Sequence, residues 1–160
     1  MSIAPVTTRF APAPTGHLHL GHVVNAIWVW GAARALGGRV LLRLEDHDRG
    51  RCRSEYERSI LDDLDWLGLV PDEPATRAFR SGATPYRQSD NLARYAAALR
   101  ALEQEGLAYA CVCSRKDLQQ SDEGRYPGTC RDRHVDPAST TMRRVRLNAV
   151  DGAEHFVDLR

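Results

Sequence analysis

Residues 9–22 read RFAPAPTGHLHLGH and combine two prolines, a glycine turn and three histidines. They follow a strand-like run, Val6–Phe10, and they precede a run with helical periodicity from Val23 to Leu36. This order of strand, rigid loop and helix places the histidines at a helix start, where unpaired backbone N–H groups and a partial positive charge favour an anion. The spacing alone favours a phosphate site, with an ordinary strand-to-helix loop bearing surface histidines as the alternative.

The pattern downstream continues as alternating strands and helices. Val40–Leu44 is a short apolar run of the kind found in buried parallel strands. Two helices are expected after it, one from Ser54, where Glu57 completes a capping box, and one over about 89–105. The helix that follows the histidines is expected to share one apolar face among Val24, Ile27, Trp28, Gly31 and Ala35. Together these elements predict an α/β fold with a parallel, doubly wound sheet.

The composition limits the classes of protein to consider. With 160 residues, of which 42% are apolar, the chain can bury one sizeable core and a small satellite. The net charge of +1 gives no support to a basic nucleic-acid-binding tail, although tRNA binding through a local patch is compatible with it. The sequence shows no membrane-spanning run and no signal peptide, so we expect a cytoplasmic protein without a membrane partner, and we expect a monomer.

A second polar segment, Arg43–Asp48, reads RLEDHD and ends the predicted second strand. Doubly wound sheets bind ligands at the carboxyl ends of their strands. An acidic side chain there can hold a substrate ammonium group, while Arg9 on the first strand pairs with a carboxylate through two parallel hydrogen bonds. The residues alone favour a simpler interpretation, in which the acidic cluster caps the next helix and pairs with Arg49, Arg51 and Arg53.

Three of the four cysteines lie within twenty residues of one another: Cys111, Cys113 and Cys130. In a reducing compartment such a group suits tetrahedral Zn²⁺ bound through thiolates, with no open position and therefore a structural role. The spacing leaves the fourth ligand open between Tyr126, an unusual donor, and His134, an ordinary one. Thiols without a metal are the alternative, and the isolated Cys52 is expected to be one.

The pattern changes after residue 106, and we expect two domains, 1–106 and 107–160. The second domain contains a strand-like run at 107–112 and a predicted strand pair at 142–148 and 155–159. Because the last predicted strand coincides with the end of the chain, we expect this domain to be truncated at its C-terminal end.

Both polar segments resemble motifs of the class I aminoacyl-tRNA synthetases, in the branch specific for glutamate. His19-Leu20-Gly21-His22 is similar to the HIGH tetrapeptide of that class, and RLEDHD is similar to the R-I-E-D-x-D motif of this branch. The run RFAPAPTG is similar to its usual RFAPSPTG, but Ala13 replaces the serine and removes one hydroxyl from the expected amino-acid pocket.

The resemblance implies catalytic roles for His19 and His22, which would steady the ATP phosphates as charge builds at the α-phosphorus. The implied ATP-binding residues are Thr15, Gly16, His19, Gly21 and His22. The implied glutamate-binding residues are Arg9, Phe10, Ala11, Pro12, Ala13 and Glu45. Among these, Arg9 is expected to hold the side-chain carboxylate of glutamate, and Glu45 is expected to hold its ammonium group.

The cysteine segment resembles the C-x-C…Y-x-x-x-C pattern of the glutamyl-type synthetases, where it lies in a segment inserted between the halves of the Rossmann domain. The run YPGTCR at 126–131 is similar to that family's sequence. The resemblance implies a structural zinc ion held by Cys111, Cys113, Tyr126 and Cys130, with His134 in reserve. The implied fold is α/β: the N-terminal half of a Rossmann-like, HIGH-type class I synthetase catalytic domain with a small zinc-binding insertion.

Residues 49–57, RGRCRSEYE, resemble the glutamyl-Q tRNA(Asp) synthetases, a short branch of this family. That resemblance implies ATP-dependent activation of L-glutamate, with Mg²⁺ accompanying ATP, and transfer of the glutamyl group to queuosine in the anticodon of tRNA(Asp). An N-terminal fragment of a glutamyl-tRNA synthetase is the second interpretation. A non-catalytic, zinc-stabilised nucleotide-binding remnant is the alternative from another class of protein.

The chain contains a single lysine, Lys116, among its 22 basic residues. The second ATP motif of the family, KMSKS, needs lysines, and the sequence around Lys116 is not similar to it. A missing phosphate clamp costs orders of magnitude in rate. We therefore expect an N-terminal portion of a synthetase-like ligase, weakly active or inactive by itself in forming glutamyl-adenylate.

Overall fold

The computed structural model describes residues 6–114, 116–117, 126 and 128–145. The chain packs as two compact units, Met1–Ala93 and Arg94–Arg160, which are described in turn. The domain boundary at residue 106 that the sequence indicates stays a prediction. Within the described ranges, no helix combines the length and the apolar character needed to cross a membrane.

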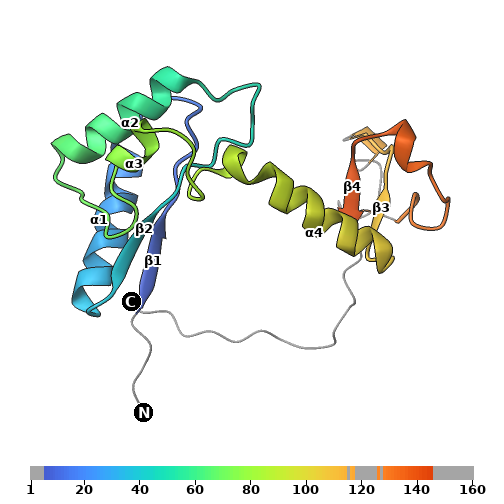
Figure 1. Cartoon of the computed structure of the whole chain (residues 1–160), viewed down its shortest axis with the longest axis horizontal. Helices are drawn as coiled ribbons and strands as arrows, with labels where there is room; N and C mark the ends of the chain where they lie inside the picture. Colours follow the sequence, from blue (N-terminus) through green and yellow to red (C-terminus); the bar gives the residue numbers. More distant parts are fainter. Residues whose placement is uncertain (1–5, 115, 118–125, 127, 146–160) are drawn as a thin grey trace, which may run out of the picture. The chain divides into compact units, whose positions relative to one another are not determined.

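The first unit is built on a parallel strand–helix–strand motif (Figure 1). Strand β1, Thr7–Phe10, lies beside strand β2, Arg39–Leu42, and runs parallel to it. Helix α1, Leu20–Ala35, makes the connection and packs against both strands. The predicted order of strand, loop, helix and parallel strand is confirmed, although the helix begins at Leu20 rather than at Val23.

Three short elements complete this unit: α2 at Ser54–Trp66, α3 at Arg77–Arg80 and a 3-10 helix at Gln88–Asn91. Helix α2 has Arg53 as its N-cap, and no side chain caps it. The capping box expected of Ser54 and Glu57 is therefore wrong. The carboxylate of Glu57 is instead engaged by Arg87, whose Nη2 lies 2.6 Å from it.

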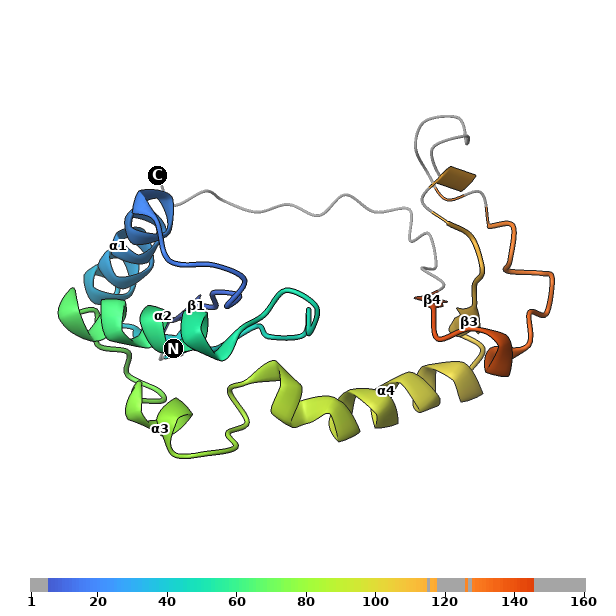
Figure 2. The same ribbon diagram turned by 90° about the horizontal axis from the view of Figure 1, so that it is seen from above.

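The hydrophobic core lies where α1 and α2 meet the strands, and Figure 2 shows these two helices next to each other. Its buried members are Phe10, Ala26, Trp30, Ala33, Val40, Leu42, Leu44, Ile60, Leu61, Leu64 and Phe79. The rings of Phe10 and Trp30 meet edge to face with their centres 5.6 Å apart. Burying each large aliphatic side chain contributes about 2 kcal/mol, so this cluster is the main source of stability of the first unit.

The buried face of α1 differs from the predicted one. Ala26 and Trp30 are buried, whereas Val24 and Trp28 are 53% and 73% exposed. Helix α1 is apolar nearly all round, so periodicity alone selects no face. The tertiary contacts select it, because a small alanine lets the helix approach the strands and the Trp30 indole donates to the carbonyl of Val70 at 2.9 Å.

The second unit holds most of helix α4, Leu92–Gln104, together with a short antiparallel strand pair. Strand β3, Ala108–Ala110, pairs with β4, Arg143–Val145. The predicted strand at 142–148 is thus found in part. Its partner is β3, and the expected partner at 155–159 lies outside the described residues.

Helix α4 and the strand pair are tied together by polar contacts. Arg143 on β4 forms an ion pair with Glu103 on α4. The ladder between the strands continues one step further, because the N–H of Cys111 donates to the carbonyl of Met142 at 3.2 Å. A short 3-10 helix, Pro137–Ser139, precedes β4. The first cysteine of the predicted metal cluster is therefore fixed by the end of a strand.

Candidate functional site

The start of α1 is capped by two of the histidines that the sequence singles out. His19 is the N-cap, and its Nδ1 accepts a hydrogen bond from the N–H of Gly21 at 3.1 Å. Nδ1 of His22 accepts in turn from the N–H of His19 at 3.2 Å, and the two ring centres lie 3.9 Å apart. The result is a reciprocal capping box in which two imidazoles replace the usual hydroxyl and carboxylate.

This cap determines where the imidazole protons reside. A neutral imidazole carries one N–H, and a ring nitrogen that accepts a hydrogen bond does not carry it. His19 and His22 therefore both present Nε2–H as a donor. Two neighbouring donors at the positive end of a helix dipole suit an anion such as phosphate. The amide of Gly21, which the family resemblance implies as an ATP-binding residue, donates to Nδ1 of His19.

His17 lies apart from the other two histidines. Its Nδ1 is 2.9 Å from the hydroxyl of Ser59, and its ring meets the edge of Tyr56 with the centres 4.9 Å apart. Both partners belong to α2. His17 is therefore a packing residue on that helix and does not share the site at the start of α1.

The loop between β1 and α1 presents some of its predicted site residues and buries others. Ala13 is exposed and Thr15 half-buried, and beside Gly16 the space is open, since an added Cβ would meet no atom within 4 Å. Ala11 is half-buried. Phe10 and Pro12 are buried, so the side chain of Phe10 belongs to the core.

Arg9 and Glu45 lie on one face of the strand pair. Arg9 is level with Leu41, and the ladder continues beyond β2, because the N–H of Glu45 donates to the carbonyl of Pro12 at 3.1 Å. Glu45 alternates with the buried Leu44, so it faces away from the core, as Leu41 does. Glu45 lies four residue steps beyond Leu41, the residue level with Arg9. The levels of Arg9 and Glu45 are therefore separated by roughly 13 Å along the strand.

Arg43 lies between these two levels on the same face. Its Nε is buried, and no described group accepts a hydrogen bond from it. A carboxylate is the partner that best suits an unpaired guanidinium nitrogen. Arg43 thus adds a second cationic group to the face that carries Arg9. Arg43 is part of the RLEDHD motif, but the sequence does not mark it as different from the other arginines of the chain. The structure does, because its Nε is buried and has no hydrogen-bond partner among the described residues.

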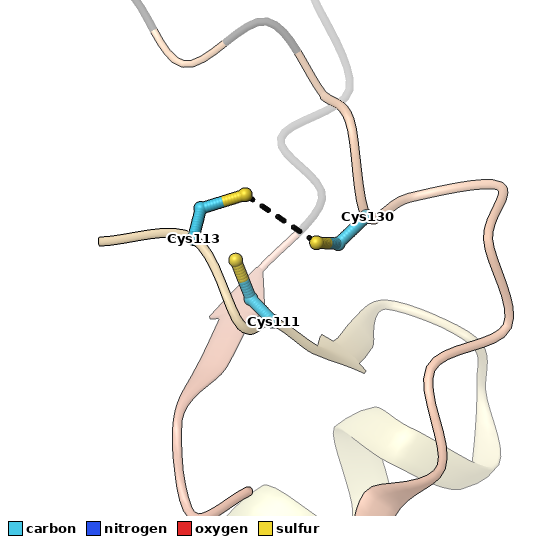
Figure 3. A group of neighbouring side chains, drawn as sticks. All are labelled: Cys111, Cys113 and Cys130. Atoms are coloured by element: carbon cyan, nitrogen blue, oxygen red, sulfur yellow. Dashed lines mark hydrogen bonds between the residues drawn. The ribbon is translucent and has the colours of Figure 1, made fainter. Parts of the chain in front are cut away.

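The second constellation lies in the second unit, where three cysteine side chains point toward one another (Figure 3). The sulfur atoms of Cys111, Cys113 and Cys130 all lie within 4.8 Å of one another, and those of Cys113 and Cys130 are 3.4 Å apart. Ligands about 2.3 Å from a tetrahedral zinc ion lie about 3.8 Å apart. The three thiols therefore fit such an ion without rearrangement of the backbone.

Tyr126 joins the cysteines, and His134 does not. The hydroxyl oxygen of Tyr126 lies 3.5 Å from the sulfur of Cys111 and 3.9 Å from that of Cys113. It also accepts a hydrogen bond from the N–H of Cys130 at 2.9 Å. No histidine or carboxylate among the described residues shares the cluster, and His134 is exposed. The geometry favours Tyr126 over His134 as a fourth donor.

The thiols differ in how readily they ionise. Burial raises the pKa of the Cys111 thiol, but hydrogen bonds from Tyr126, the Cys113 backbone and Arg144 outweigh burial and lower that pKa to about 6. The hydrogen bond with Cys130 raises the pKa of Cys113 to about 11. Burial, and then the bond to Cys111, raise the pKa of Tyr126 above its usual value. Of Cys111 and Cys113, Cys111 therefore ionises at the lower pH, beside a neutral phenol.

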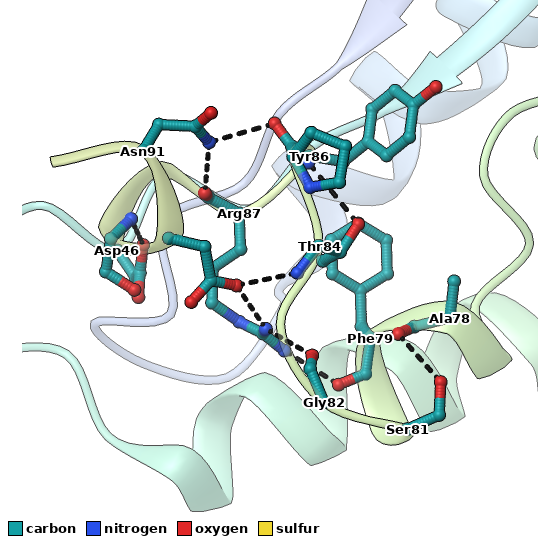
Figure 4. A network of polar contacts seen from close by, with 12 residues as sticks. Asp46, Ala78, Phe79, Ser81, Gly82, Thr84, Tyr86, Arg87 and Asn91 are labelled. Carbon is teal, nitrogen blue, oxygen red and sulfur yellow. Dashed lines mark hydrogen bonds and ion pairs between the residues drawn. The ribbon is translucent and has the colours of Figure 1, made fainter. Parts of the chain in front are cut away.

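The acidic segment after β2 is anchored by a polar network in the loop between α3 and the 3-10 helix Gln88–Asn91 (Figure 4). Oδ1 of the buried Asp46 accepts from the N–H of Ser89 at 2.8 Å. Arg87 donates to the carbonyls of Phe79 and Gly82 at 2.7 and 3.0 Å, in addition to its pair with Glu57. Asp46 thus has a structural role, but at the 3-10 helix Gln88–Asn91, and the expected cap on the next helix, α2, is wrong because no side chain caps it.

A cavity of about 230 Å³ lies beside this network. Its lining includes Pro14 from the loop before α1, Asp46 and Cys52. Arg9, Glu45 and the capping histidines do not line it. Burial, followed by the charges of Asp46 and Asp48, raises the pKa of the Cys52 thiol, so Cys52 is a protonated thiol outside the cysteine cluster.

Known proteins resemble this chain in sequence and in structure. It is 48% identical to the glutamyl-Q tRNA(Asp) synthetase of Rhodobacter capsulatus over 79% of this chain and 46% of that protein. It is 45% identical to glutamate–tRNA ligase 2 of Acidithiobacillus ferrooxidans over 85% of this chain and 29% of that protein. A crystal structure of a glutamate tRNA ligase from Elizabethkingia meningosepticum, in complex with its amino acid, matches 73% of this chain and 23% of its own, with a TM-score of 0.60 and 36% identity.

The chain thus spans half or less of the length of these relatives. The resemblance seen in the motifs extends over nearly its whole length, because the family model of the tRNA synthetases class I (E and Q), catalytic domain, matches residues 5–159. The predicted α/β class and the predicted family are confirmed at this level. The chain belongs to the family of class I tRNA synthetases (E and Q), with which it shares catalytic-domain sequence.

Proposed function

We propose that this chain forms the N-terminal part of a site that activates L-glutamate with ATP. The observation that carries the proposal is the reciprocal histidine cap, which leaves the Nε2–H donors of His19 and His22 available at the start of α1. Donors that are held in place before the reaction stabilise negative charge as it develops on the phosphates. The open loop at Thr15 and Gly16 gives ATP, with its Mg²⁺, access to them.

Glutamate is placed on the outer face of the strand pair. Arg9 holds its side-chain carboxylate, Glu45 its ammonium group, and the loop at 10–13 supports both through its backbone. The α-carboxylate of glutamate then attacks the α-phosphorus of ATP. A bond forms between the carboxylate oxygen and phosphorus as the bond to pyrophosphate breaks. The glutamyl group afterwards moves from the adenylate to a hydroxyl of the acceptor, so that an ester bond forms, the bond to AMP breaks and the hydroxyl proton is released.

The acceptor that we propose is queuosine in tRNA(Asp). The relatives named glutamyl-Q tRNA(Asp) synthetase, at 40–48% identity, support this choice. The 45% identity to a glutamate–tRNA ligase supports tRNA(Glu) as the second candidate. Labelled glutamate offered to tRNA(Asp) with and without queuosine, and to tRNA(Glu), separates the two candidates by which tRNA becomes labelled.

We propose further that the segment 107–160 is a zinc-binding insertion. Cys111, Cys113, Tyr126 and Cys130 would hold the ion, and four protein ligands leave no position open, so its role is structural. When bound, the zinc ion cross-links the end of β3 to the loop around Cys130. The separations among the thiols and the phenol oxygen, given above, support this assignment.

Calorimetric titration of the chain with ATP and Mg²⁺ tests the phosphate site. The variant His19→Asn keeps a side-chain acceptor at the N-cap, but its shorter amide does not extend as far as Nε2–H of the imidazole, so the helix start is preserved while the donor at the far side of the ring is lost. We expect His19→Asn and His22→Ala each to weaken ATP binding about tenfold, the loss of one hydrogen bond to a charged group. His17→Ala, the matched control because His17 packs against α2 away from the start of α1, should bind ATP like the parent chain. Equal affinity in all four proteins, or no binding by the parent, would contradict the proposal.

A further inference from the structure

Arg144, on β4, contacts two residues of the cysteine cluster at once. Its Nε donates to the sulfur of Cys111 at 3.2 Å, and its guanidinium carbon lies 3.9 Å from the centre of the Tyr126 ring. Arg144 is half-buried, opposite Tyr109 in the antiparallel pair. Neither the spacing of the cysteines nor the motif around them points to a residue this far along the chain.

The neighbouring arginine shows that this placement is specific. Arg143 forms an ion pair with Glu103 and donates to the carbonyl of Thr140, so it anchors β4 to α4. Successive strand residues point to opposite faces. Of two adjacent arginines, one is therefore used for packing the unit and the other is directed at the cluster.

A cation beside Cys111 and Tyr126 would offset the negative charge that the metal-bound cluster carries. Three thiolates around a divalent ion carry one net negative charge, and a neutral phenol adds none. An N–H donor to a thiolate sulfur withdraws charge from it and fixes its orientation, which is the usual contribution of a residue behind a metal ligand. Arg144 makes this bond to Cys111.

Tyr126 is the weakest ligand of the four and is held from two sides. The N–H of Cys130 donates to its oxygen, while the guanidinium of Arg144 lies over its ring. A cation over an aromatic face contributes about 0.5–2 kcal/mol. The stacked guanidinium therefore keeps the phenol oxygen directed at the three sulfur atoms.

We propose that Arg144 is a positioning residue of the metal centre, which offsets the negative charge at Cys111 and holds Tyr126 in the fourth ligand position. This inference rests on the zinc centre proposed above. It predicts that Arg144, although it does not touch the ion, determines both the affinity for zinc and the electron density on one of its sulfur ligands.

Metal binding by the whole chain tests the proposal. Zinc affinity is measured by competition with a chromophoric chelator, and Co²⁺ is bound in place of zinc so that the sulfur-to-cobalt charge-transfer band can be recorded. We expect Arg144→Gln to weaken zinc binding about 10–100-fold and to move that band to lower energy, because the Cys111 sulfur loses its donor. Arg144→Lys keeps the positive charge but cannot stack a planar group on the Tyr126 ring. Its zinc affinity and its cobalt band should therefore lie between those of the parent chain and those of Arg144→Gln.

Arg133→Gln is the matched control, because it removes the same charge from an exposed position of the same unit. It should leave the zinc affinity and the cobalt spectrum unchanged. If the parent chain binds zinc and all variants match it in affinity and spectrum, the role of Arg144 is refuted and the metal centre stands. If the parent chain binds neither metal, both proposals fail. If Arg144→Gln does not fold, Arg144→Lys decides by the same two readouts.

Discussion

The two histidines at the start of α1 show how a single side chain serves both fold and chemistry. Nδ1 of each ring satisfies a backbone N–H of the helix start, and Nε2–H of each is thereby left as a donor. A serine or an asparagine at position 19 would also cap the helix, but its shorter hydroxyl or amide would not extend as far as the Nε2–H donor of the imidazole. The helix cap therefore sets the protonation of the proposed phosphate ligands.

Another residue-scale constraint lies where β2 begins. A Cβ added to Gly38 would lie 2.3 Å from the carbonyl oxygen of Val6, which accepts the N–H of Arg39. We expect Gly38→Ala to lower the free energy of unfolding by about 2 kcal/mol, because backbone must move to relieve the overlap. Gly31→Ala is the control: a Cβ on this exposed α1 residue meets nothing within 4 Å, and we expect a gain of about 0.5–1 kcal/mol from helix propensity. Urea denaturation followed by tryptophan fluorescence measures both, and equal effects would contradict the packing argument.

Among the elements, the loop from Ser81 to Asn91 is held by Arg87, which forms ion pairs with Glu57 of α2 and with Asp90 of the loop itself. Arg87 is 12% exposed and Glu57 19%, and the hydrogen bond between them is the main reason that the pKa of Arg87 lies above its usual value. The same guanidinium donates to two backbone carbonyls. The loop is thus tied to α2 at the point where it also supports Asp46 through Ser89.

Removing this arginine should be costly. We expect Arg87→Met to lower the free energy of unfolding of the first unit by about 3 kcal/mol, since Glu57 is then left half-buried without a partner. Arg80→Met is the comparison, because Arg80 pairs with Asp62 and Asp65, which are 70% and 51% exposed, and such pairs contribute less than about 1 kcal/mol. Urea denaturation curves of the parent chain and of both variants measure the two losses in the free energy of unfolding. Similar losses would mean that the buried pair is no stronger than the surface one.

At the scale of the whole molecule, the two units have different sources of stability. The first has an apolar cluster of eleven buried residues contributed by strands and helices. The second has a pair of three-residue strands beside the cysteines, and no residue of α4 is buried. The described residues of the second unit bury little apolar surface, so we expect the proposed metal cross-link to have a large share in its stability.

Zinc removal should therefore affect the units unequally. We expect a chelator to speed amide exchange in β3 and β4 by about tenfold or more. Trp28, Trp30 and Trp66 all lie in the first unit, so tryptophan fluorescence should not change. Amide exchange measured by mass spectrometry with and without chelator tests this prediction. Equal acceleration of exchange in β1 and β2 would contradict it.

The pH dependence of zinc binding has a definite sign. With a pKa of about 11, Cys113 is protonated at neutral pH and must release its proton to bind the ion. Cys111, with a pKa of about 6, is already a thiolate there and is protonated only in acid. Zinc affinity should therefore rise as the pH rises and fall further below pH 6, and competition titrations at several pH values measure this.

Much of this molecule can be predicted from local patterns. The parallel strand–helix–strand order follows from a short apolar run on either side of a helical one, and the motifs at 9–22, 43–48 and 111–131 point to the family that the comparisons confirm. The cysteines of the cluster could be recognised because three thiols within twenty residues are typical of a metal site. Such features can be recognised from residue order, periodicity and motif, even where the contacts that form them join residues far apart in the sequence.

The remaining features depend on contacts between distant residues. The buried face of α1 is decided by Trp30 reaching Val70 and by alanines that fit the strands, since a helix that is apolar all round carries no directional pattern. Arg144 reaches Cys111 across an antiparallel pair, from 33 residues away. By itself, the sequence determined the order of the elements and the chemistry of the motifs, because these are local. Which side chains meet from distant parts of the chain was decided by the tertiary structure alone, because packing selects among faces and partners that the local pattern leaves equivalent.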